Sequence, residues 1–115
     1  MKNLGQKKAF SEEMKLALAC MSQGELDQSF FHLERAHILG QTTVISHIRS
    51  HWWMLRVGWT RHDMAEVRGQ ILRIIFALLF SRLWVPLGNT GGANVNPLKR
   101  MSLPEDLKHI MKRLR

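Results

Sequence analysis

Apolar residues recur every three or four positions along most of the chain, which is the spacing of one face of an α-helix. Alternating apolar and polar runs, which are typical of strands, are nearly absent. The pattern predicts an all-α protein with helices at about residues 11–22, 25–39, 43–59, 63–83 and 103–113. Short linkers join the first four, so we expect two antiparallel helical hairpins packed into a four-helix bundle, followed by a short C-terminal helix.

Two predicted helices begin at residues that favour helix starts. Ser11 precedes Glu12 and Glu13, which predicts an N-cap at Ser11 with two acidic residues in the first turn. Asp63, with Glu66 three positions later, resembles a capping box at the start of the fourth helix.

Apolar stripes predict which faces of the third and fourth helices are buried. The stripe on the third helix comprises Val44, Ile48, Trp52, Leu55 and Trp59. The stripe on the fourth helix comprises Met64, Val67, Ile71, Ile74, Ile75 and Leu78. Because such stripes normally face the core, we expect Trp52 and Trp59 to be core residues.

The first hairpin has the residue spacing of a tetratricopeptide unit. Gly24, Ser29, Leu33 and Ala36 follow the alternation of small and large residues that lets two helices cross closely. Solenoids usually need three or more units, so the spacing indicates tetratricopeptide-like packing within a hairpin and not a repeat protein.

Residues 84–101 interrupt the helical pattern with a cluster of Gly, Pro and Asn, which predicts a long loop. Its backbone N–H groups and the side chains of Asn89, Thr90 and Asn94 are candidates for contacting a ligand, or for folding over a neighbouring site as a lid. The alternative is a loop that simply packs on the bundle through its apolar residues. No Gly-Lys-Ser/Thr sequence follows, so the segment is not a nucleotide-binding Walker loop.

Length and composition limit the class of protein. At 115 residues, 45% of them hydrophobic, the chain has room for one domain and one core. A single cysteine, Cys20, excludes an internal disulfide and a multi-thiolate zinc site, and it favours the cytoplasm. The most apolar stretch, residues 71–87, contains Arg73 and Arg82, so we expect no transmembrane segment.

The charge of the chain favours anionic partners. Seventeen Lys and Arg against nine Asp and Glu give a net charge of +8. One hypothesis is therefore a non-catalytic interaction module, in which the first hairpin and the basic tail dock on an acidic protein partner. A second is nucleic-acid binding, which lacks the support of any base-reading motif.

Four residues on the second and third predicted helices form a candidate metal site. Glu34 and His37 are three positions apart and His47 and His51 are four apart, so each pair projects from one helix face. Because residues 40–42 leave room only for a short turn, the two helices should pack antiparallel and bring the pairs together. Three imidazoles and a carboxylate suit zinc, iron or copper. The alternative is that these are core histidines, each hydrogen-bonded to a neighbour.

Nucleophilic catalysis has little support in the sequence. Cys20 lies in an apolar stretch of the first helix, where a buried thiol is expected, and no serine lies in a Gly-x-Ser-x-Gly context. We assign no catalytic residue, and any reaction would be metal-assisted.

Several segments resemble a known family. They are Ala36–Gln41 (AHILGQ), His51–Leu55 (HWWML), Gly69–Ile74 (GQILRI), Val85–Val95 (VPLGNTGGANV) and Pro104–Leu107 (PEDL). Together they are similar to the small bacterial family numbered 3703 among the domains of unknown function. The resemblance implies a stand-alone helical protein and supplies no activity. It also implies that His37, His47, His51 and the Gly-rich loop recur in relatives, which favours a shared site.

Overall fold

The computed structural model of the chain describes residues 3–79, 91–93 and 101–112. Within them lie five helices and no strand: α1 (Leu4–Ser22), α2 (Leu26–Gly40), α3 (Val44–Thr60), α4 (Met64–Leu79) and α5 (Glu105–Lys112). The all-α prediction is confirmed. The predicted end of the fourth helix at residue 83 and most of the predicted loop lie outside the described residues.

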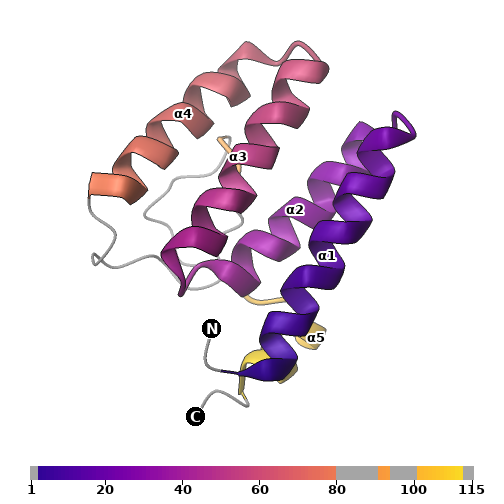
Figure 1. Cartoon of the computed structure of the whole chain (residues 1–115), viewed down its shortest axis with the longest axis vertical. Coiled ribbons are helices and arrows are strands. Elements are labelled where there is room, and N and C mark those ends of the chain that lie inside the picture. Colours follow the sequence, from indigo (N-terminus) through magenta and orange to yellow (C-terminus); the bar gives the residue numbers. More distant parts are fainter. Residues whose placement is uncertain (1–2, 80–90, 94–100, 113–115) are drawn as a thin grey trace.

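The helices pack mainly against their neighbours in the sequence. Helix α1 packs along α2 and α3 along α4, and the two hairpins meet through α2 and α3 (Figure 1). Helix α5 contacts α1 and α2 near the start of α1. The predicted pair of helical hairpins with a short C-terminal helix is therefore confirmed. None of the helices described here is both long enough and apolar enough to cross a membrane.

Helix α1 begins seven residues before the predicted N-cap, so the assignment of Ser11 as the cap is wrong. The cap is Asn3, whose side-chain oxygen accepts hydrogen bonds from the backbone N–H groups of Gly5 and Gln6. Asparagine caps a helix as well as serine does, and the added turns bury Gln6 and Phe10. Because Gln6 is polar, the apolar pattern did not extend to this first part of the helix.

The apolar stripe predicted for α3 is not the face that is buried. Trp52 and Trp59 are 47% and 62% exposed, so their expected place in the core is wrong. The buried face instead carries Ser46, Ser50, His51, Met54, Val57 and Gly58. Small residues on this face let α2 and α4 approach α3 closely, which bulky indole rings would prevent.

The inward face of α4 also differs from the predicted stripe. Met64, Ile71, Ile75 and Leu78 are exposed, whereas the buried positions are Glu66, Val67, Gln70 and Ala77. Two long polar side chains are therefore buried where α4 packs against α3. Buried polar groups normally have hydrogen-bond partners, and those of Glu66 and Gln70 lie at the candidate site described below.

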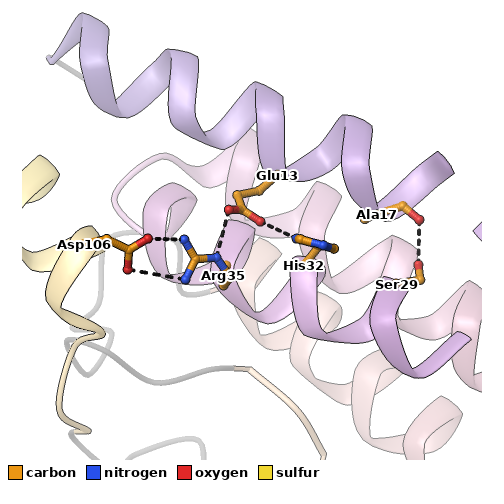
Figure 2. A network of polar contacts seen from close by, with 6 residues as sticks. All are labelled: Glu13, Ala17, Ser29, His32, Arg35 and Asp106. Carbon is orange, nitrogen blue, oxygen red and sulfur yellow. Dashed lines mark hydrogen bonds and ion pairs between the residues drawn. The ribbon is translucent and has the colours of Figure 1, made fainter. Parts of the chain in front are cut away.

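A network of polar contacts joins α1, α2 and α5 (Figure 2). The Glu13 carboxylate accepts a hydrogen bond from Arg35 Nε at 2.8 Å, and its other oxygen lies 2.7 Å from His32 Nδ1. The Arg35 guanidinium also pairs with both carboxylate oxygens of Asp106 on α5. This contact raises the pKa of Arg35 and lowers that of Asp106. Arg35 therefore links α5 to the first hairpin.

Replacement of Arg35 by methionine is expected to destabilise the protein by about 1–2 kcal/mol, since it removes charge-assisted hydrogen bonds but keeps the aliphatic stem. Urea unfolding measures the difference. Arg68→Met, at an exposed position of α4, is the matched control and should change stability by less than about 0.5 kcal/mol. Equal effects of the two substitutions would show that the Arg35 network does not hold α5.

Candidate metal centre

Three histidine side chains converge where α2 meets α3. His37 lies in the last turn of α2, and His47 and His51 lie on successive turns of α3. The intervening turn is closed by a hydrogen bond of 3.1 Å from the Thr43 N–H to the Gly40 carbonyl. The short linker and the four-residue spacing thus place all three imidazoles on one side of the α2–α3 contact. We call them the histidine trio.

The three Nε2 atoms of the trio form a small triangle. They are separated by 3.0 Å (His37 to His47), 3.0 Å (His47 to His51) and 3.2 Å (His37 to His51). The ring planes are inclined at 59–66° to one another, so the rings surround a common point and do not stack. A tetrahedral ion about 2.0–2.1 Å from each nitrogen sets its ligands about 3.3 Å apart. The trio therefore matches the spacing of a metal site closely.

Glu34, the fourth predicted ligand, is not part of this triangle. Glu34 is half-buried on α2, one turn before His37, and its carboxylate is not among the donors that converge in the described part of the chain. Its role as a ligand stays a prediction. Asn89, Thr90 and Asn94, the predicted loop contacts, lie outside the described residues.

Burial governs the protonation of two members of the trio, His47 and His51. His37 and His51 are each 2% exposed, and His47 is half-buried. Desolvation lowers the pKa of His47 to about 4. Desolvation also lowers the pKa of His51 to about 3, and the nearby charges of His47 and Arg73 contribute to this shift. His47 and His51 are therefore uncharged at pH 7, as metal ligation by imidazole requires.

Two buried residues of α4 lie next to the trio, on the Nδ1 side of the His51 ring. The side-chain oxygen of Gln70 lies 2.5 Å from His51 Nδ1. The amide nitrogen of Gln70 donates a hydrogen bond of 2.6 Å to the Glu66 carboxylate. Both side chains are almost completely buried. The sequence pattern did not identify either residue as part of the site, since Glu66 was interpreted only as part of a capping box.

The described part of the Gly-rich segment, residues 91–93, lies against the same groups. The Gly91 carbonyl accepts a hydrogen bond of 2.9 Å from Gln70 Nε2, and the Ala93 N–H donates one of 2.8 Å to Glu66. Gly91 has a φ of +83°, and a Cβ at this position would lie 2.6 Å from His37 Cδ2. Only glycine fits here, because both the backbone conformation and the contact with the imidazole exclude a side chain.

Gly91→Ala is therefore expected to weaken metal binding about tenfold or more, because either the segment or the His37 ring must move. Zinc titration of the folded variant measures the change. Gly24→Ala is the matched control, since Gly24 also has a positive φ of +77° but has nothing within 4 Å of the added Cβ. Gly24→Ala should lower the free energy of unfolding by about 1 kcal/mol, as Gly91→Ala does, but it should keep the wild-type metal affinity. Equal metal affinities of the two variants would contradict the contact between Gly91 and the trio.

Comparisons with known proteins place the chain in a family but assign no activity. A family model described as "Protein of unknown function (DUF3703)" matches residues 5–111. Comparison with curated proteins gives no match, and neither does comparison with solved structures. The chemistry of the site therefore has to be argued from its own residues.

Proposed function

We propose that this chain, which belongs to the DUF3703 family, binds one transition-metal ion through His37, His47 and His51. The observation that carries the proposal is the convergence of three imidazole Nε2 atoms within 3.0–3.2 Å of one another. The lone pairs of three imidazole nitrogen atoms packed this closely repel one another unless protons or a cation lie between them. A metal ion would satisfy all three lone pairs at once.

The type of donor narrows the choice of metal. Imidazole nitrogens suit zinc, copper and iron, whereas magnesium and calcium prefer oxygen ligands. Since the chain has a single cysteine, a thiolate-rich site is excluded. We therefore propose zinc, copper or iron as the ion. Because the chain has a single cysteine, we also propose that the protein works in the cytoplasm.

The three imidazoles leave at least one coordination position for another ligand. Glu34 is the candidate from the protein, because it lies on the same helix as His37, one turn away. With a water molecule in that position instead, a zinc ion would lower the pKa of the water to about 7, as in catalytic zinc sites. Coordination by Glu34 favours a metal-holding role, and coordination by water favours metal-assisted hydrolysis.

The proposal is tested by adding metal to the untagged full chain after removal of metal with a chelator. We expect zinc or copper to bind with one ion per chain and to raise the melting temperature. Stabilisation of about 2.7 kcal/mol is expected at a free-metal concentration of one hundred times Kd. A folded protein that is stabilised by none of zinc, copper or ferrous iron would contradict the proposal and favour the interaction-module hypothesis.

A further inference from the structure

The amide group of Gln70 has a defined set of neighbours. Its side chain is fully buried, its oxygen faces His51 Nδ1, and its nitrogen faces the Glu66 carboxylate and the Gly91 carbonyl. Glu66 also accepts the backbone N–H of Ala93. All these distances are 2.5–2.9 Å, so each contact is a short hydrogen bond.

These neighbours determine which way the Gln70 amide points. A carboxylate and a backbone carbonyl can only accept hydrogen bonds, so the group that faces both must be the NH₂, which has two hydrogens to donate. The reversed amide would place its oxygen against two acceptors and lose both bonds. The Gln70 oxygen must therefore face His51.

The orientation of Gln70 in turn determines the protonation of His51. Because the Gln70 oxygen can only accept, His51 Nδ1 must carry the hydrogen and donate it. A neutral imidazole carries one hydrogen, so Nε2 of His51 carries none and presents its lone pair. That lone pair points to the centre of the trio, where a metal ion would bind.

We propose that Glu66 and Gln70 are positioning residues of the metal centre, which hold His51 as the Nδ1–H tautomer with Nε2 free to coordinate. The role of this orientation in metal binding rests on the proposed function, but the tautomer itself does not require a bound metal. Gln70 Nε2 and the Glu66 carboxylate, which are hydrogen-bonded to each other, also bind the Gly91 carbonyl and the Ala93 N–H. Docking of this segment and orientation of His51 are therefore parts of one hydrogen-bond network.

The first test is a long-range ¹H–¹⁵N correlation spectrum of the metal-free, full-length protein at pH 7. The expected result is that His51 is protonated at Nδ1 and unprotonated at Nε2. A spectrum in which His51 carries its hydrogen at Nε2 would overturn the inference. Because no metal is present, this result is separate from the failure of metal binding, which would contradict only the proposed function.

The second test is the substitution Gln70→Leu. Leucine fills much of the same space but offers no acceptor to His51 Nδ1, so the contact that holds the hydrogen on Nδ1 is lost. We expect both tautomers of His51 in the spectrum and zinc affinity lower by about 10–100-fold, as for other residues that orient metal ligands. A purely structural role would change stability but not the tautomer.

The matched control is Gln28→Leu, at an exposed position near the start of α2. It should leave the tautomer and the zinc affinity unchanged. A folded Gln70→Leu protein with the wild-type tautomer and an affinity within about twofold of wild type would overturn the inference. If Gln70→Leu fails to fold, the spectrum of the wild-type protein decides the question alone.

Discussion

The double variant His47→Ala/His51→Ala is expected to lose at least about a thousandfold in metal affinity. Each substitution removes one of three converging nitrogen donors, and a single remaining imidazole binds an ion no better than an exposed histidine does. The stabilisation of the wild-type protein by zinc should therefore be absent in the variant. Thermal unfolding with and without zinc measures this difference.

Two further variants separate loss of the site from loss of the fold. His47→Ala alone changes a half-buried residue, so the protein should fold and still lose most of its affinity. The control His62→Asn/His109→Ala removes two exposed imidazoles, with asparagine chosen because His62 has a positive φ. It should bind metal as wild type does. Strong zinc binding by a folded His47→Ala/His51→Ala protein would show that the metal binds elsewhere.

The metal-free protein is expected to lose about 3 kcal/mol of stability between pH 7 and pH 5. Burial lowers the pKa of His47 to about 4 and that of His51 to about 3, whereas both have the ordinary value near 6.5 in the unfolded chain. Below pH 6.5 the unfolded chain therefore binds protons that the folded protein does not. The contribution of the two neutral imidazoles to stability is therefore fully present above this pH. It is lost as the pH falls toward the pKa values of the folded protein.

Urea unfolding at several pH values, in the presence of a chelator, measures this dependence. His47→Gln is the informative variant, since it keeps a polar side chain of similar size but cannot titrate. It should show about half of the wild-type loss. A wild-type protein whose stability is constant from pH 7 to pH 5 would contradict the burial of His47 and His51 as neutral imidazoles.

The convergence of the trio could be predicted from the sequence because local geometry determines it. His47 and His51 are four residues apart on one helix, and a short turn places His37 beside them. These constraints depend on neither α4 nor the Gly-rich loop. Three donors therefore converge as expected in the described part of the chain.

The supporting residues could not be predicted in the same way. Glu66 and Gln70 reach the site only because α4 packs on α3, and no local pattern specifies which face of α4 turns inward. The apolar stripe indicated the wrong face, since aliphatic residues lie all around this helix. The sequence feature that marks the inward face of α4 is the pair Glu66 and Gln70, two long polar residues four positions apart on one face of the helix.

The same reason explains the error for the tryptophans. Helix α3 has apolar residues on several faces, so hydrophobic periodicity alone did not decide between them. The small residues Ser46, Ser50 and Gly58 decide it, because they permit close approach of the neighbouring helices. Close packing depends on residue size as well as on hydrophobicity.

X-ray absorption spectroscopy of the zinc-loaded, untagged protein tests most directly whether the trio binds one ion. We expect one zinc per chain and three nitrogen scatterers about 2.0–2.1 Å away, with the multiple-scattering pattern of imidazole rings. A protein that holds no zinc, or a spectrum with oxygen scatterers and fewer than three imidazoles, would contradict binding by His37, His47 and His51.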